Sequence, residues 1–306
     1  MQISVASSSL IAVPIIEAIL GSEHSLASVI STPDSKSGRG QIETPTSLAA
    51  WSEERGYLVA KPFDTPSLNQ HLLTAQPQLI ITASYGRMIP VEVLHGPRFG
   101  WLNVHFSTLP RWRGAAPVQW ALLEGDNTTG ITIFKLDKGM DTGPIYFQEE
   151  IEIGPLDTTS ELLDRMSQLA GRRIMNVVEE IRKSVKPKAQ ANIGITLAPK
   201  ISKEQAKLNW NEGAESILRK IRALEQRPGT WTIFREERIG IHGVAESLLP
   251  NRMSQNGEIS LEGSSLLIRC LDSTLEISHV TPAGKKRMTG AEFARGARLI
   301  SGERFE

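Results

Sequence analysis

The chain has 306 residues, 40% of them hydrophobic and 22% charged, and its formal net charge is zero. This length suits two domains, and the composition excludes a disordered or fibrous chain. The single cysteine, Cys270, excludes an intrachain disulfide framework and a thiolate zinc site. Because the six histidines show no ligand spacing, we expect no metal, and the cysteine usage predicts a cytoplasmic protein.

Charge is distributed unevenly along the chain. Residues 1–181 contain 13 Lys and Arg against 20 Asp and Glu, whereas 182–203 contain six basic residues and no acid. Residues 204–306 are close to balanced, with 15 basic against 14 acidic residues. The basic segment and the half that follows could contact a polyanionic partner. A solvated linker is the alternative interpretation.

Short apolar runs at 2–6, 26–31, 78–83 and 100–104 predict buried strands, with helical patterns between several of them. The first twenty residues have no basic start and are interrupted by Pro14 and Glu17, so neither a signal peptide nor a membrane span is predicted. Alternating strands and helices predict an α/β domain with an open, mostly parallel Rossmann-like sheet. Residues 130–137 and 145–153 are expected to continue it.

A helix is predicted to begin at Thr158, where Glu161 completes a capping box before an apolar stripe. Prolines and lysines then dominate residues 186–205, which is typical of a linker across a surface. From 206 an amphipathic helix and five short strands predict a small antiparallel β-barrel of the oligonucleotide-binding type. The predicted domains are therefore 1–185, a basic linker 186–205, and 206–306.

Two polar residues stand at the end of the run 100–104. Asn103 and His105 are two apart, so their side chains share one face of a strand, at the edge where open parallel sheets bind ligands. Asp141 lies between Gly139 and Gly143, which permit close approach of another segment. An Asp near His105 would favour its imidazolium and orient the ring. Each residue also has a structural alternative: a satisfied histidine, and an Asp that stabilises its own turn.

Several motifs are absent. The first strand is followed by "VASSSLIAVP" rather than GxGxxG, and the chain contains neither GxxxxGK[ST] nor GxSxG. A dinucleotide, a triphosphate and a serine-hydrolase mechanism are therefore disfavoured.

The segment "NVHFSTLPRWRGAAPVQWALLEGDNTTGITIFKLDKGMDTGPI", residues 103–145, resembles the signature region of formyltransferases that use 10-formyltetrahydrofolate. Further similarity lies in "SYGRMIP" (84–90), "APKISKEQAKLNW" (198–210), "IRALEQRPGTW" (221–231) and "TPAGKKRMTGAEFARG" (281–296). Two places depart from the family pattern. The turn after the first strand lacks the usual Gly-Thr-Pro-Glu-Phe, and residues 225–227 replace Asn-Pro at the entry to the second domain.

The resemblance implies roles for particular residues. Asn103, His105 and Asp141 match the catalytic positions, and the turn of Ser107, Thr108, Leu109 and Pro110 matches the folate contact. Arg39, in "SGRG", aligns with a loop that approaches the tRNA acceptor stem. From their charge, Lys200, Lys203, Lys285, Lys286 and Arg287 are candidates for further tRNA contacts. Arg111, Trp112 and Arg113 either contact the tRNA end or pack beneath the loop.

The implied reaction transfers the formyl group of 10-formyltetrahydrofolate to the α-amino group of methionyl-initiator tRNA. We expect Asn103 and a protonated His105 to stabilise the tetrahedral oxyanion, with no metal and no covalent intermediate. The chain is expected to act as a monomer without a protein partner or membrane. The alternatives are a formyltransferase acting on a small amine, a 10-formyltetrahydrofolate hydrolase, and an inactive nucleic-acid-binding module.

Overall fold

The computed structural model describes residues 1–37, 41–249 and 253–306. The chain divides into two compact units, each described here by itself. Unit 1 comprises Met1–Pro117, Asn127–Ile153 and Glu161–Pro199, and unit 2 comprises Val118–Asp126, Gly154–Ser160 and Lys200–Glu306. Among the described residues, no helix is both long and apolar enough to span a bilayer.

Unit 1 is built on a seven-stranded sheet with the order β5-β2-β1-β6-β7-β8-β9. The first five strands in this order run parallel, and the last two are antiparallel to their neighbours. The strands are β1 (Gln2–Ala6), β2 (Ser25–Ile30), β5 (Val59–Ala60), β6 (Leu79–Thr82), β7 (Trp101–His105), β8 (Thr128–Lys135) and β9 (Ile145–Glu152). The predicted Rossmann-like sheet is thus confirmed.

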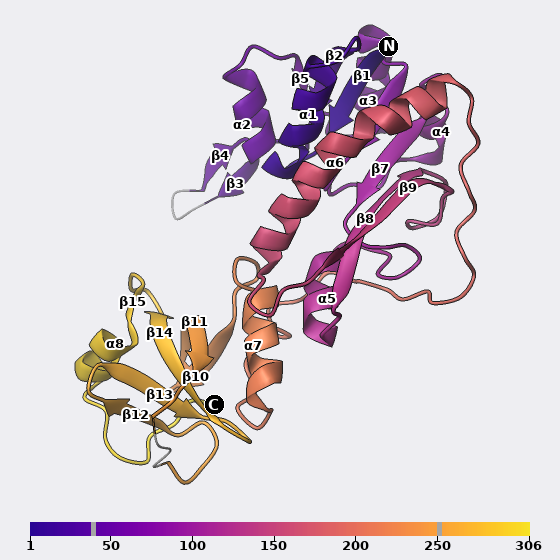
Figure 1. The fold of residues 1–306 in the computed structure, drawn as a ribbon. Coiled ribbons are helices and arrows are strands. Elements are labelled where there is room, and N and C mark those ends of the chain that lie inside the picture. Colours follow the sequence, from indigo (N-terminus) through magenta and orange to yellow (C-terminus); the bar gives the residue numbers. More distant parts are fainter. Residues whose placement is uncertain (38–40, 250–252) are drawn as a thin grey trace. The chain divides into compact units, whose positions relative to one another are not determined.

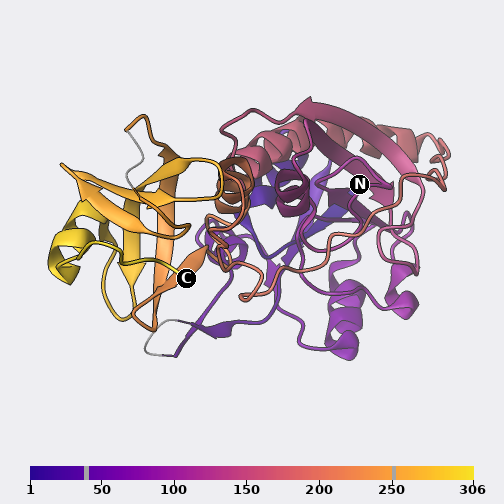
Figure 2. The same ribbon diagram turned by 90° about the horizontal axis from the view of Figure 1, so that it is seen from below.

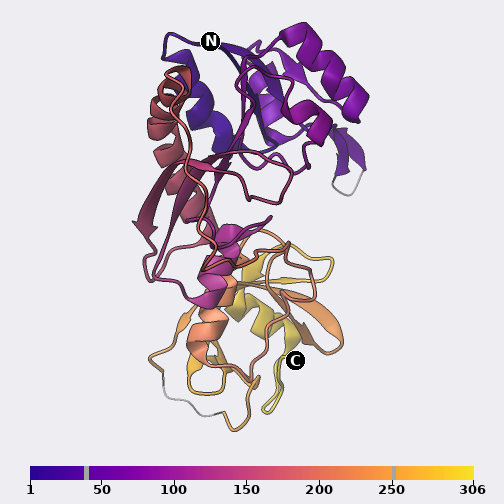
Figure 3. The ribbon, with the colours of Figure 1, turned by 90° about the vertical axis from the view of Figure 1, so that its right-hand side faces the viewer.

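Helices cover both faces of this sheet (Figures 1 and 3). On one face lie α1 (Val13–Leu20) and the long α6 (Thr159–Arg182); on the other lie α3 (Thr65–Ala75) and the short α4 (Val91–Leu94). A buried cluster joins α3 and α4 to the central strands through Leu68, Ile80, Leu94 and Trp101. The remaining elements of unit 1 are η1 (Leu10–Ala12), α2 (Ser47–Glu53) and the hairpin of β3 (Ser35–Ser37) and β4 (Ile42–Thr44), whereas α5 (Pro117–Glu124) belongs almost wholly to unit 2.

After α6 the chain continues through residues 183–199, which we call the strap; Figure 2 shows it as a long extended trace across unit 1. Its backbone is paired at two places. Lys188 exchanges hydrogen bonds with Ile145 at 2.7 and 2.8 Å, and the carbonyl of Thr196 accepts from Arg113 N at 3.0 Å. The N–H of Ala198 donates back to the Arg113 carbonyl at 2.7 Å. The strap therefore pairs with β9 and with the segment after β7.

Unit 2 is an antiparallel, curled sheet with the order β10-β11-β14-β13-β12, and β15 pairs with β14. Its elements are α7 (Ala214–Ala223), β10 (Trp231–Phe234), β11 (Glu237–Glu246), β12 (Ile259–Glu262), β13 (Ser265–Arg269), β14 (Thr274–Pro282), β15 (Met288–Thr289) and α8 (Gly290–Ala297). The rings of Phe234, Phe293 and Phe305 pack together in its core. This sheet confirms the predicted antiparallel, barrel-like second half.

The last residues of the chain bond to both ends of the unit 2 sheet. Ile259 N, on β12, donates to Glu303 O at 2.9 Å. Ile233, on β10, exchanges two hydrogen bonds with Glu306 at 2.9 and 3.2 Å. Residues 303–306 therefore bridge β12 and β10, which do not pair directly in the sheet order.

Candidate active site

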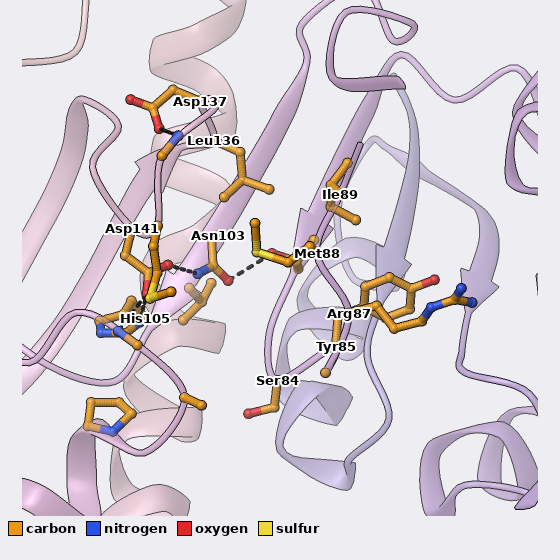
Figure 4. A pocket seen from close by; sticks show the side chains of 18 of the residues that line it. Ser84, Tyr85, Arg87, Met88, Ile89, Asn103, His105, Leu136, Asp137 and Asp141 are labelled. Atoms are coloured by element: carbon orange, nitrogen blue, oxygen red, sulfur yellow. Dashed lines mark hydrogen bonds and ion pairs between the residues drawn. The ribbon is translucent and has the colours of Figure 1, made fainter. Parts of the chain in front are cut away.

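A cavity of about 420 Å³ opens at the carboxyl ends of β6 and β7 in unit 1. Parallel strands present their ligand sites at this edge, as the sequence predicted. The wall consists of the segments 84–89, 103–106, 114–115 and 136–141, with Thr82, Leu94 and Pro117. Figure 4 shows Asn103, His105 and Asp141 together on one side of the cavity, with Tyr85, Met88 and Ile89 on the other.

Asn103 is oriented by the neighbouring strand. The hydroxyl of Thr82, on β6, donates to Asn103 Oδ1 at 2.7 Å. Because the amide oxygen is engaged there, the amide nitrogen Nδ2 is left toward the cavity, where it lies 3.5 Å from Asp141 Oδ1. The two strands thus present an N–H donor at the floor of the cavity.

The imidazole of His105 is buried and held on one side only. Its Nε2 lies 2.8 Å from the carbonyl oxygen of Trp112, so Nε2 carries a proton and donates it there. Its Nδ1 lies 3.7 Å from Asp141 Oδ2. Nδ1 is therefore the ring nitrogen that can take up or release a proton.

Asp141 reaches this pair from the loop between β8 and β9. Its backbone is left-handed, with φ of 52°, which is uncommon for a residue with a side chain. Gly114 N donates to Asp141 Oδ2 at 2.8 Å and fixes the carboxylate. A Cβ at Gly143 would collide with the Lys135 carbonyl, so the loop can approach β8 only with glycine there. The close approach of this loop to β8 is the reason for a glycine at position 143.

Two opposing effects set the protonation of His105. Burial lowers the pKa of His105 below its usual value, while the charge of Asp141 and the hydrogen bond to the Trp112 carbonyl act to raise it. Burial is the larger effect, so the neutral imidazole is favoured in the free protein. The protonated His105 expected from the sequence therefore differs from the structure. The effect of burial on the pKa of His105 is larger than that of the Asp141 carboxylate.

The segment Arg111–Arg113 supports the site from behind. The Trp112 ring is buried, and the Arg111 guanidinium lies 4.3 Å from its centroid. Arg113 donates from Nε and Nη2 to Gln190 Oε1 of the strap, at 3.1 and 2.6 Å. Of the two interpretations left open for Trp112, this geometry favours packing beneath the loop.

The turn Ser107–Pro110 does not line the cavity. Ser107 and Leu109 are buried; the Ser107 hydroxyl donates to Arg111 O at 2.6 Å, and Leu109 N donates to Thr132 Oγ1 at 3.1 Å. These bonds make the turn a support for the segment after β7. Its folate contact stays a prediction.

The candidate tRNA-binding residues are exposed where they are described. Lys200 and Lys203 lie at the start of the main part of unit 2, and Lys285, Lys286 and Arg287 lie between β14 and β15. Arg39 lies outside the described residues.

The sequence reasoning missed one surface of unit 2, which we call the outer face: Trp231, Arg238, His242 and His279. Strand register pairs Trp231 with Gly240 and His242 with His279, and paired residues point to the same side of a sheet. The alternate residues Ile239 and Ile241 are buried, so these side chains point outward. Arg238 lies 4.4 Å from the Trp231 ring centroid. Burial lowers the pKa of His242, and the charge of Arg287 adds to this shift.

The sequence reasoning also missed most of the wall opposite Asn103. Tyr85, Met88, Ile89 and Leu136 give the cavity an apolar side, and Arg87 is held by the carbonyl oxygens of Pro62 and Phe63. The resemblance over 84–90 contained a signal for this wall, because these residues follow β6, the strand that neighbours β7.

A second cluster of titratable groups lies at the amino end of the sheet. Among the described residues, one group of acidic and histidine side chains could hold a metal ion. It consists of Glu23, His24 and Glu179, whose potential ligand atoms lie within 4.8 Å of one another. Arg182 lies 2.8 Å from Glu23 and 3.1 Å from Glu179, and His24 Nδ1 lies 3.2 Å from the Met1 ammonium. These contacts give the cluster a structural role as an ion-pair network.

Comparison with known proteins bears on this site. Residues 1–178 match the family described as Formyl transferase, and residues 200–298 match Formyl transferase, C-terminal domain. The curated Methionyl-tRNA formyltransferase of Salinispora tropica is 36% identical over 306 residues, with 99% of each chain covered.

Two solved structures share the fold. HypX from Aquifex aeolicus in complex with tetrahydrofolic acid has a TM-score of 0.67 at 17% identity, covering 96% of this chain and 47% of that one. Methionyl-tRNA formyltransferase from Clostridium thermocellum has a TM-score of 0.57 at 18% identity, covering 90% of this chain and 98% of that one. With both parts of the family pattern matched and a relative aligned over nearly its full length, the chain belongs to the methionyl-tRNA formyltransferase family.

Proposed function

We propose that this protein transfers the formyl group of 10-formyltetrahydrofolate to the α-amino group of methionyl-initiator tRNA. The observation that carries the proposal is the convergence of Asn103, His105 and Asp141 at one cavity, in a chain of this family. Residues 1–185 would hold the chemistry, 186–205 would be the basic linker, and 206–306 would bind tRNA. The proposed setting is the cytoplasm, with the protein acting as a monomer.

The reaction needs alignment more than activation. A free α-amino group has a pKa of about 7.7 to 8.0, and an ester neighbour lowers it, so much of the amine is neutral near pH 7. Asn103 Nδ2 donates to the oxygen of the formyl carbon as negative charge develops there. The bond from the amine nitrogen to the formyl carbon forms, and the bond from that carbon to N10 of the folate breaks.

His105 handles the proton that the amine must lose. The neutral ring accepts it at Nδ1, directly or through a water, and returns it to N10 as that nitrogen leaves. Asp141 stabilises the imidazolium that exists between these steps, at the 3.7 Å separation seen here. A buried neutral imidazole beside a carboxylate suits this exchange better than a permanent cation.

The cavity has features that suit a flat, partly apolar donor. Tyr85, Met88 and Ile89 provide apolar surface opposite the catalytic group, Leu136 adds to it, and Asp137 and Lys138 belong to the polar part of the lining. A ligand site of this kind combines apolar walls with a few oriented polar groups. The tetrahydrofolate complex of the HypX structure supports a folate in this fold. Ser107–Pro110 would act by holding in place the segment after β7 that lines this cavity.

The exposed basic residues of unit 2 suit the sugar-phosphate backbone of tRNA. Lys285, Lys286 and Arg287 adjoin the outer face, where the Arg238 guanidinium lies over the Trp231 ring. Lysine and arginine neutralise phosphates, and such contacts make affinity fall as salt rises. Lys200 and Lys203 are proposed to add further phosphate contacts, and Arg39 to approach the acceptor stem.

The direct test incubates the purified protein with 10-formyltetrahydrofolate and methionyl-tRNA, initiator and elongator in separate reactions. Formylmethionyl-tRNA is expected from the initiator at a much higher rate than from the elongator. Free formate and tetrahydrofolate without formylmethionine would instead identify a hydrolase. A substitution of His105 by Ala provides the matched background, because contaminating activity would survive it.

A further inference from the structure

Two side chains of the strap, Gln190 and Thr196, bond to the segments that carry or contact His105 and Asp141. Neither side chain lines the cavity. Gln190 Nε2 lies 2.8 Å from the carbonyl oxygens of both Asp141 and Gly143. Its Oε1 accepts two hydrogen bonds from Arg113. One amide therefore joins the loop that carries Asp141 to the segment that follows His105.

Thr196 acts on the other half of the pair. Its Oγ1 accepts a hydrogen bond from Trp112 N at 2.8 Å, and the Trp112 carbonyl in turn accepts from His105 Nε2 at 2.8 Å. The hydroxyl of Thr196 is thus two hydrogen bonds away from the imidazole. Thr196 O also accepts from Arg113 N, which fixes the same peptide unit from its other side.

The backbone conformations at these two places show why such support is needed. Asp141 and Trp112 both have left-handed backbones, with φ of 52° and 62°. Residues with side chains keep this conformation only where surrounding contacts define it. At Asp141 the contact to the carbonyl comes from Gln190, and at Trp112 the contact to the N–H comes from Thr196.

We propose that Gln190 and Thr196 of the strap are positioning residues that set the separation and orientation of His105 and Asp141. The inference rests on the proposed function and goes beyond it: a segment whose composition indicates a linker holds both members of the proton-transfer pair. Neither residue lines the cavity, so neither is placed to touch a substrate.

The experiment compares four variants with the wild-type chain. Gln190→Glu keeps an acceptor for Arg113 but has no N–H for the carbonyls of Asp141 and Gly143. Thr196→Val removes the acceptor for Trp112 N at nearly constant volume, and Thr196→Ser restores it. Asn192→Ala removes an exposed amide from the same strap and is the control.

We expect Gln190→Glu and Thr196→Val each to lower kcat roughly tenfold or more, because small misplacements of catalytic groups are costly. The KM for methionyl-tRNA and for the folate should stay within about threefold, since binding surfaces are intact. Thr196→Ser and Asn192→Ala should stay within about threefold of wild type in all three constants. All rates are expressed per folded protein, measured by circular dichroism.

A second readout follows the imidazole itself. The polar groups that act on His105 are the Asp141 carboxylate from the β8–β9 loop and the Trp112 carbonyl, with the Phe134 ring edge-on at 6.5 Å. Both polar groups favour the imidazolium, so loosening either one should move the His105 NMR titration to lower pH. In Gln190→Glu the new carboxylate opposes this shift, so Thr196→Val, which adds no charge, is the variant that tests its direction. The titration is measured on full-length protein without substrates.

The outcomes are decisive in each case. Unchanged kcat together with an unchanged His105 titration would overturn the inference, as would rates that fall only in proportion to the amount of folded protein. If one variant does not fold, the other and its titration decide. If the wild-type chain formylates no methionyl-tRNA, the proposed function fails, and the His105 titration still accepts or rejects the positioning role.

Discussion

The cavity of unit 1 and the basic turn Lys285–Arg287 of unit 2 both gather polar side chains, but they differ in burial and in how narrowly each side chain is fixed. At the cavity, the partners of Asn103 and His105 come from neighbouring strands or loops and lie 2.7 to 3.7 Å away. On unit 2 the turn Lys285–Arg287 is exposed, and its charges are close together. A buried group interacts strongly with its partner because little water screens it. An exposed charge contributes little alone, so such charges affect binding through their combined field.

The comparison predicts its largest effect at the cavity. Asn103→Ala removes the donor to the developing oxyanion, and His105→Ala removes the proton acceptor. Each should lower kcat by on the order of a hundredfold or more, since loss of one such donor has that effect. Single-turnover formylation of saturating methionyl-tRNA measures it, with folate binding followed separately. Turnover within a few-fold of wild type, with folate bound, would show that the cavity does not carry the chemistry.

The next largest effect concerns the loop that carries Asp141. Gly143→Ala places a methyl group against the Lys135 carbonyl, so the loop must move away from β8. We expect kcat to fall by roughly tenfold to a hundredfold, because Asp141 is displaced from His105. Gly263→Ala is the control: it lies on unit 2, where a Cβ meets open space, although its positive φ adds strain. Equal kcat for Gly143→Ala and wild type would show that the close approach is unnecessary.

A smaller effect is expected on unit 2, where charge is shared. Replacing Lys285, Lys286 and Arg287 together by Gln should weaken tRNA binding by roughly threefold to tenfold at moderate salt. The slope of log affinity against log salt should decrease by about 0.7 to 0.9 for each phosphate that the variant no longer neutralises. Filter binding across a salt series tests this. A slope equal to that of wild type would place the tRNA elsewhere.

The smallest effect is a change in one titration curve. Burial already lowers the pKa of His105, and Asp141 opposes that shift. Asp141→Asn removes the opposing charge, so the pKa of His105 should fall further. Because the folded-state pKa lies below the unfolded value of about 6.5, protonation favours unfolding, and the variant should lose stability more steeply as pH falls below that value. A His105 resonance that titrates at higher pH in the variant would contradict the assignment.

The sequence predicted much of the fold because local patterns carried it. The buried runs at 2–6 and 100–104 match β1 and β7 within a residue, since continuous apolar stretches are typical of parallel strands. The positions of Asn103 and His105 at a strand end followed from the same pattern. Their convergence with Asp141 came from resemblance, because no local spacing relates β7 to the loop after β8.

Other parts of the site had no local signal. Composition indicates a surface linker for 186–205, and nothing in it specifies that Gln190 and Thr196 bond to Asp141 and Trp112. These contacts depend on tertiary pairing between the strap and the segment after β7. The charge balance of His105 likewise depends on burial, which the sequence pattern does not quantify. The outer face of unit 2 depends on strand register in the same way.

The bridge formed by residues 303–306 has a consequence for association between molecules. β10 and β12 are the terminal strands of the main sheet order, and unpaired terminal strands can recruit strands from other chains. Glu303 and Glu306 occupy backbone groups of both, and Thr232 Oγ1 adds a bond to the Glu306 carbonyl at 2.9 Å. The bridge thus protects two strand edges against intermolecular β-pairing. A chain ending at residue 302 would lose this bridge together with the buried Phe305, and we expect it to form oligomers or aggregates.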